Sequence, residues 1–325
     1  MTITDAPPGY APLENDVPWD PSYLELVPPE RVLMLDEFGP DAAGPTALSP
    51  VAITTPFRFL SEEGIGVMHA VCSELERFAG ANNRIAKCAR GGVYRSAFLR
   101  GMSADPHLLE FLGGLAQAPI EPHPVGHHAM HVNYAPDELG KNVDQWHCDV
   151  VSFDYVLMVS DPRPLKGGRF EYFHGPVEDG RDLLVEGTGL PPERVVSVEF
   201  PGPGWAVLQQ GHRVLHRATR LEERGERITA VASFYTPDPE IPDPADLPTL
   251  RAADGNDIAL VEWSRYASVV AARRLQHFAE EGASFSRSRE ELQAEMRACI
   301  AVVEDAIEEL DREEQGALIS FGEGE

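Results

Sequence analysis

The chain has 325 residues, of which 43% are hydrophobic, and a formal net charge of −26. That apolar content is enough for a sizeable core and excludes a wholly disordered chain. The negative charge argues against a nucleic-acid partner, because phosphate-binding surfaces are basic. No apolar run approaches the roughly 18 residues of a membrane span, and residues 1–5 do not begin a secretory signal. We therefore expect a cytoplasmic protein without membrane contact.

The N-terminal part of the chain is predicted to lie outside the core. Residues 1–50 are rich in proline and acidic residues, which predicts an extended segment that wraps the surface. A helix is predicted over 61–78, where apolar residues recur about every 3.6 positions. Another begins at Asp105, an N-cap followed by proline at the first helical position. Residues 51–128 are thus predicted to form a helical region that flanks the core.

Residues 129–240 show a different pattern, with short β-rich runs separated by glycine and proline turns. The predicted strands cover 130–134, 153–159, 168–173, 195–200, 205–209 and 227–235. Many short strands with such turns are typical of a sandwich or a jelly roll. The sequence therefore predicts a mainly β core, within 129–240, with flanking helices.

The last part of the chain, 241–325, is predicted to be helical again. One helix covers about 257–281, and another begins at Ser288, where Glu291 completes a capping box. Apolar residues follow in the second helix at steps of three and four, namely Leu292, Met296, Cys299, Val303, Ile307 and Leu310. This spacing predicts that the region packs on the core or on itself. The alternative is a homodimer contact through the C-terminal helices.

A candidate metal site lies in the segment Gln145-Trp146-His147-Cys148-Asp149. Residues two apart in a strand project from the same face, so His147 and Asp149 can reach one ion. A third ligand should come from a distant strand, and His216 is the best candidate, with His212 as its competitor. Two histidines and one carboxylate form the facial triad of non-haem Fe(II) oxygenases, which leaves coordination positions open.

An arginine follows the third candidate ligand on the last predicted strand of the core. Arg227 and Thr229 share one face of that strand. An arginine can clamp a carboxylate through two parallel hydrogen bonds, and a hydroxyl two residues on can add a third. The pair is therefore a candidate site for an organic acid. The alternative is a surface ion pair of Arg227 with the acidic exterior.

Taken together, these motifs resemble the Fe(II)/2-oxoglutarate-dependent dioxygenase superfamily, most closely its prolyl-hydroxylase-like branch. The resemblance rests on four segments, which are 146–149, 166–170, 215–218 and 225–229. It implies a double-stranded β-helix, or jelly roll, in which His147, Asp149 and His216 bind Fe(II). Arg227 would then bind the distal carboxylate of the cosubstrate 2-oxoglutarate.

The same resemblance implies further cosubstrate contacts and an activity. Thr229 stands where the family often has a hydroxyl that assists the arginine. Tyr134 matches a strand tyrosine that often contacts the cosubstrate, and Tyr155 is a second candidate. The implied reaction uses O₂ to oxidise an unactivated C–H bond of a small molecule, such as an amino acid or specialised metabolite, and releases succinate and CO₂. Asp149 favours hydroxylation, desaturation or cyclisation, because halogenating relatives have a small residue there.

Other functions and contacts stay open at this point. A jelly-roll protein that binds a metal or acid for sensing, without turnover, and a cupin-type isomerase are the alternative functions. Candidate substrate contacts are Arg95, Arg100, His131 and Arg169, and for each arginine the alternative is a salt bridge in an acidic protein. The cluster of His123, His127, His128 and His131 could form a second metal site, although its spacing does not suit one strand face.

Overall fold

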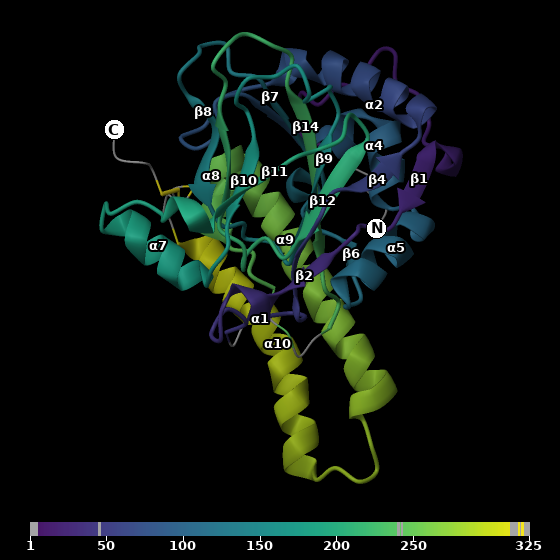
Figure 1. Ribbon diagram of the computed structural model, residues 1–325. Coiled ribbons are helices and arrows are strands. Elements are labelled where there is room, and N and C mark those ends of the chain that lie inside the picture. The colour runs from purple at the N-terminus through teal and green to yellow at the C-terminus, as the bar shows by residue number, and fades with distance from the viewer. Residues whose placement is uncertain are drawn as a thin grey trace.

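The computed structural model describes residues 6–44, 47–238, 241, 243–312, 318 and 320–321. Two antiparallel sheets form the centre of the molecule, with helices packed around them (Figure 1). The minor sheet has the order β11-β10-β13-β8, with strands β8 (Asn142–His147), β10 (Phe170–Phe173), β11 (Val195–Val198) and β13 (His216–Arg220). Among the described residues, no helix is both long and apolar enough to cross a membrane.

The major sheet contains ten strands, seven of which follow the order β1-β4-β12-β9-β14-β7-β5. Its strands are β1 (Leu24–Val27), β2 (Val32–Met34), β3 (Val51–Thr54), β4 (Phe57–Leu60), β5 (Cys88–Arg90), β6 (Glu121–Pro122), β7 (His131–Tyr134), β9 (Phe153–Met158), β12 (Trp205–Gln209) and β14 (Ile228–Tyr235). The α-helices are α1 (Leu35–Phe38), α2 (Glu62–Leu75), α3 (Gly92–Arg95), α4 (Ala97–Ser103), α5 (Pro106–Ala116), α6 (Gly126–Ala129), α7 (Val177–Val185), α8 (Leu247–Asp254), α9 (Asn256–His277) and α10 (Arg289–Asp311).

The predicted fold class, a mainly β core of jelly-roll type with flanking helices, is confirmed. Each of the six predicted strands is present, with shifts of at most two residues at their ends. The two sheets face each other without closing into a continuous barrel. The predicted helices at 61–78 and from Asp105 are α2 and α5, whose N-caps are Ser61 and Asp105.

The N-terminal part contributes more to the sheet than the sequence predicted. Within 1–50, β1 and β2 join the major sheet, and within 51–128 the strands β3, β4, β5 and β6 do so. These strands are two to four residues long, and such short runs show no clear alternation in a sequence. The predicted region 51–128 is therefore a mixture of strands and helices.

The main hydrophobic core lies between the outer face of the major sheet and the helices α2, α4 and α5. Alternation along β14 sends Ile228, Ala230 and Ala232 into this core. Thr229 and Val231 therefore point to the inner face, toward the minor sheet, where they line a cavity. Because the outer face is anchored by apolar burial, the register that selects the inward residues is strongly specified.

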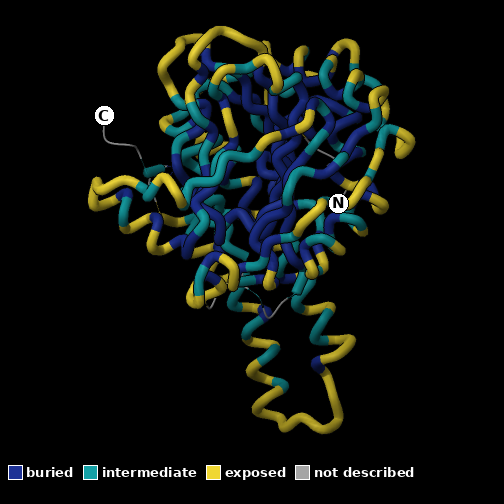
Figure 2. Tube along the Cα trace, viewed as in Figure 1, coloured by how far each residue is buried: buried dark blue, intermediate teal, exposed yellow. Residues whose placement is uncertain are grey.

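The C-terminal helices form a hairpin that projects from the body of the protein (Figures 1 and 2). Both predicted helices are confirmed, and Ser288 and Glu291 form the predicted capping box of α10. The first half of α9 packs with α8 through Leu250, Trp263 and Tyr266. The distal half extends into solvent, and three of the predicted apolar positions of α10 are exposed, namely Met296, Val303 and Ile307.

A buried carboxylate connects α9 to the body of the protein. Glu262 is 2% exposed and accepts hydrogen bonds from the Tyr94 hydroxyl, the Gly126 amide at 3.0 Å and His127 Nδ1 at 3.1 Å. Arg265 also donates to it, at 3.1 Å. Burial disfavours the charged carboxylate, but these partners outweigh burial and lower the pKa of Glu262. The hairpin is thus attached through an ionised, fully partnered group.

We predict that Glu262→Ala destabilises the protein by about 3–5 kcal/mol, because it removes one member of a buried charge network. Glu281→Ala, at an exposed position beyond α9, is the matched control and should change the free energy of unfolding by less than about 0.5 kcal/mol. Urea unfolding of both variants measures the difference. A loss below about 1 kcal/mol for Glu262→Ala would contradict the structural role of the carboxylate.

Candidate metal centre

Two histidines face each other across adjacent strands of the minor sheet. In the register of β8 with β13, His147 lies directly opposite His216. Their ring centroids are 4.1 Å apart. Both side chains are buried, with exposures of 3% and 5%. The pairing of two strands thus places two imidazoles at one point of the inner face, where a single ion can contact both.

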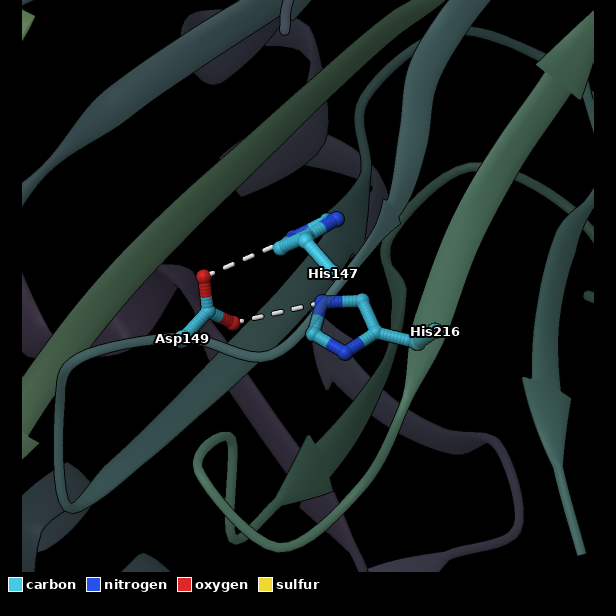
Figure 3. Close-up of side chains that lie close together, drawn as sticks. All are labelled: His147, Asp149 and His216. Carbon is cyan, nitrogen blue, oxygen red and sulfur yellow. Dashed lines mark ion pairs between the residues drawn. The ribbon is translucent and has the colours of Figure 1, made fainter. Parts of the chain in front are cut away.

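The carboxylate of Asp149 lies between the two imidazoles (Figure 3). Its Oδ1 is 3.5 Å from His147 Nε2, and its Oδ2 is 3.2 Å from His216 Nε2. The ligand atoms of the three residues all lie within 4.8 Å of one another. Burial opposes ionisation of Asp149, but His216 and His147 outweigh it and hold its pKa well below the ordinary value. Asp149 is therefore a charged candidate ligand.

Backbone carbonyls hold both imidazoles in the orientation that a metal requires. The Nδ1 atom of His147 lies 2.6 Å from the carbonyl oxygen of Gln145, and that of His216 lies 2.9 Å from the carbonyl oxygen of Val214. An Nδ1–H that donates to a carbonyl leaves the Nε2 lone pair free for coordination. Each ligand strand thus supplies the partner that fixes its own imidazole.

The sequence predicted that strand alternation places Asp149 beside His147. In the structure, the position of Asp149 depends on a loop instead. Strand β8 ends at His147, and the Asp149 amide donates to the carbonyl of Gly211 at 3.0 Å. A side chain at Gly211 would lie 2.2 Å from Asp154 Oδ2 and 2.9 Å from Asp149 Cβ. The segment before β13 can therefore approach the ligand loop only because residue 211 is glycine.

The structure selects His216 over His212 as the third member of the triad. Among the described residues, His147, Asp149 and His216 form the single cluster that could hold a metal ion. Two other buried histidines, His123 and His127, have structural partners instead. His123 Nε2 lies 3.4 Å from Asp243 Oδ2, and His127 donates to the Glu262 carboxylate that attaches α9.

The triad opens into a narrow cavity between the two sheets, with a volume of about 30 Å³. Several buried polar atoms that face this cavity have no hydrogen-bond partner among the described residues, namely His131 Nδ1, Asn133 Oδ1 and Asp154 Oδ2. Buried polar atoms are normally paired, because an unsatisfied one costs about 1–3 kcal/mol. Such a group of unpaired atoms fits a polar ligand.

Arg227 lies at the wall of the same cavity and is 2% exposed. Its Nε donates to the Gly168 carbonyl at 2.7 Å and its Nη1 to Thr229 Oγ1 at 3.2 Å, but no described carboxylate forms an ion pair with it. Burial lowers the pKa of Arg227 to about 10, so it is still charged near neutral pH. Gly168 has a φ of +65°, and a side chain there would meet Arg227 Cδ at 3.0 Å.

The two predicted tyrosine contacts do not face the cavity, which corrects that part of the sequence prediction. Tyr134 and Tyr155 belong to the hydrophobic core on the opposite face of the major sheet, and the Tyr134 hydroxyl donates to the Cys72 carbonyl at 2.7 Å. Thr229 is paired with Asn133. Asn133 therefore points inward, because neighbouring strand residues at the same level share a face.

Four polar residues around the triad were not predicted from the sequence, namely Arg84, Asp144, Asp154 and Gln209. Arg84 lies 3.1 Å from Asp144 and 3.9 Å from Asp149 Oδ1. Asp154 accepts a hydrogen bond from Gln209 at 2.9 Å, and burial together with the Asp149 carboxylate raises its pKa well above the ordinary value. These residues carry no local motif, since each reaches the site through long-range contacts.

Of the four predicted substrate contacts, only His131 lines the cavity. Arg95 instead lies over the Phe78 ring and donates to backbone carbonyls of the N-terminal segment. Arg100 donates to the carbonyl of Val93, and the exposed Arg169 pairs with Glu199 at 3.4 Å. Of the three arginines, Arg169 thus forms the salt bridge of the alternative interpretation, while Arg95 and Arg100 bind backbone carbonyls.

No protein-family model and no characterised protein sequence matches this chain. Solved structures that resemble it include the non-haem α-ketoglutarate-dependent carbocyclase SnoK from nogalamycin biosynthesis. The two share 13% identity at a TM-score of 0.44, over 64% of this chain and 88% of SnoK. The epimerase SnoN of the same pathway, also α-ketoglutarate-dependent, shares 14% identity at a TM-score of 0.40, over 55% and 73% of the two chains.

AviO1 from Streptomyces viridochromogenes Tue57 is a further example, with 16% identity and a TM-score of 0.43, over 57% of this chain and 90% of AviO1. The matches thus include two enzymes described as α-ketoglutarate-dependent and one described as belonging to a 2OG-Fe(II) oxygenase family. None of the matches bears on the prolyl-hydroxylase-like branch, which stays a prediction. At these TM-scores the likeness carries no argument about activity.

We predict that Fe(II) binding needs His147, Asp149 and His216 but tolerates His212→Ala. Removing one of three ligands should weaken binding by more than the roughly 10–100-fold that outer-sphere changes cost. Iron content after anaerobic reconstitution of each single alanine variant measures this. Normal iron content in His216→Ala, together with loss in His212→Ala, would overturn the assignment.

Proposed function

We propose that the protein is a non-haem Fe(II)- and 2-oxoglutarate-dependent oxygenase that oxidises an unactivated C–H bond of a small molecule. The single observation that carries this proposal is the buried, charged Arg227, which has no ionic partner among the described residues and lines the same cavity as His147 and His216 of the triad. A facial triad alone suits several divalent metals and functions. A buried cationic clamp beside it indicates an anionic cosubstrate in addition.

The residues of the cavity fit both groups. Two neutral imidazoles and one carboxylate suit Fe(II), and on an octahedral ion they leave three positions for other ligands. Arg227 and Thr229 would hold the distal carboxylate of 2-oxoglutarate, since the guanidinium already donates to the Thr229 hydroxyl and is oriented by it. Asn133, at the same level of the sheet as Thr229, would replace the predicted tyrosines as a further cosubstrate contact.

Bound iron would supply the oxidising power, by coupling O₂ reduction to decarboxylation of 2-oxoglutarate into succinate and CO₂. The protein contributes position, charge and exclusion of water. Arg227 compensates the cosubstrate charge in a site of low dielectric, where such a contact is stronger than in water. Burial and the Asp149 carboxylate raise the pKa of Asp154, which disfavours a second negative charge beside the ligand set.

The substrate is proposed to be a small molecule, such as an amino acid or a specialised metabolite, and the reaction a hydroxylation, desaturation or cyclisation. His131 is the predicted substrate contact that the geometry supports, because it lies on the inner face and its Nδ1 is unpaired among the described residues. Burial, with Arg90 and Arg84 nearby, lowers the pKa of His131 to about 3. His131 would thus act as a neutral hydrogen-bonding group. The cytoplasmic location stays a prediction.

The proposed reaction can be tested before the substrate is known. The reconstituted protein is incubated with 2-oxoglutarate and ¹⁸O₂, and succinate is analysed by mass spectrometry, with and without pools of amino acids and metabolites. One ¹⁸O atom in succinate, formed in an Fe(II)-dependent way, is the expected result. Absence of labelled succinate with every pool, in protein that retains iron, would favour a binding or sensing protein without turnover.

We predict that Arg227→Ala weakens 2-oxoglutarate binding on the order of 30-fold or more, because it removes one partner of a buried charge pair. Iron content should stay near that of the wild type, since Arg227 is not a ligand. Arg227→Lys should recover only part of the affinity, because an ammonium group cannot form the two-pronged contact.

The matched control is Arg220→Ala, which removes an exposed arginine at the end of β13 and should bind 2-oxoglutarate normally. Anaerobic calorimetric titration of 2-oxoglutarate into the Fe(II) form of each variant measures the affinities. Unchanged affinity in Arg227→Ala would remove the observation on which the cosubstrate assignment rests.

A further inference from the structure

The distal half of the C-terminal hairpin carries an exposed apolar surface. Figure 2 shows that this half of α9 and α10 is mostly exposed, away from the body of the protein. Four residues of α10, which we call the apolar stripe, are exposed at 53%, 54%, 41% and 54%, namely Met296, Ile300, Val303 and Ile307. A contiguous apolar surface of this kind marks an interaction site more often than a free surface.

The spacing of the apolar stripe is that of a helix–helix seam. Its members follow one another at steps of four, three and four residues, which is the a/d pattern of a coiled coil. The contact of α10 with the rest of the chain uses a different set of positions, since Cys299 and Ala306 are 1% and 7% exposed. The apolar stripe therefore lies beside the α9–α10 contact and is suited to a further helix.

We propose that a second copy of the chain covers the apolar stripe, through antiparallel packing of the two α10 helices about a two-fold axis. With the axis between Ile300 and Val303, Ile300 of each copy packs on Val303 of the other. Met296 of each copy then packs on Ile307 of the other. One surface thus serves both copies, as in the closed two-fold dimers that are commonest among soluble oligomers.

The charges beside the apolar stripe favour this occupant and this direction. Arg297 and Glu304 occupy equivalent flanking positions, one heptad apart on the same side of the stripe. In an antiparallel pair such positions face their equivalents, so Arg297 of each copy lies against Glu304 of the other. In a parallel pair the opposing flank would be formed by Cys299 and Ala306, which carry no charge and are buried against α9.

The antiparallel direction also suits the net charge of the chain. Two copies of charge −26 repel each other, and antiparallel pairing places their bodies at opposite ends of the paired helices. The stripe alone is small beside a standard interface of roughly 800 Å² per partner. In this arrangement, however, the tip of each hairpin passes along the body of the other copy. The tip carries the fully exposed Phe285, which would enlarge the contact.

The first test is the mass of the full-length protein in solution, measured by light scattering during gel filtration. We expect twice the chain mass of 35.7 kDa. Ile300→Asp and Val303→Asp should each give a monomer of unchanged helix content and unfolding temperature, because both positions are exposed. The matched control is Val185→Asp on α7, a position that is 73% exposed, and this variant should remain a dimer.

A charge reversal then tests the direction of pairing. Arg297→Glu and Glu304→Arg should each raise the dissociation constant of the dimer by about tenfold or more, because like charges then face each other twice. The double variant, with both changes, should restore the dimer. A wild-type monomer at micromolar concentration, a dimer that survives Val303→Asp, or a double variant no tighter than the single ones would each overturn the proposal.

Discussion

The pairing of β8 with β13 is the constraint on which the rest of the site depends. The register that sets His216 opposite His147 determines where a metal can bind, and the turn at Gly211 brings Asp149 to the same point. Each imidazole receives its orientation from a carbonyl of its own strand, so few further contacts are needed to prepare the ligands. The minor sheet carries the two histidines of the candidate metal site, while the inner face of the major sheet carries other polar groups of the cavity.

This arrangement buries charged groups, and their burial costs free energy. Arg227 is charged and buried, and its partners among the described residues are uncharged. The effective penalty for burying an ion is several kcal/mol. Apolar burial on the outer face of the major sheet offsets this free-energy penalty, because a large hydrophobic core packs there against α2, α4 and α5. One sheet thus provides stability on its outer face and a polar, partly unsatisfied surface on its inner face. An anionic cosubstrate would satisfy that surface.

The sequence was informative where the signal was local and uninformative where it depended on long-range pairing. The core strands and the inward pair Arg227 and Thr229 follow from spacing within short segments, whereas the meeting of His147, Asp149 and His216 depends on strand pairing and on the loop held by Gly211. Tyr134, the predicted cosubstrate contact, faces the hydrophobic core, because the register of β7 with β14 makes Asn133 the inward residue. Arg84 was missed, since it reaches the site from a loop far upstream. Apolar spacing on α10 predicted a helix face correctly, but it cannot say whether that face is covered.

The central claim is that one cavity holds Fe(II) and 2-oxoglutarate together. Visible absorption of the anaerobic protein tests it most directly, because 2-oxoglutarate chelated to Fe(II) through its keto oxygen and carboxylate gives a weak charge-transfer band. The band should appear only when both Fe(II) and 2-oxoglutarate are added to the wild-type protein, and it should be absent in Asp149→Ala. If no band appears, and 2-oxoglutarate binds equally well with and without Fe(II), the account of the site is contradicted.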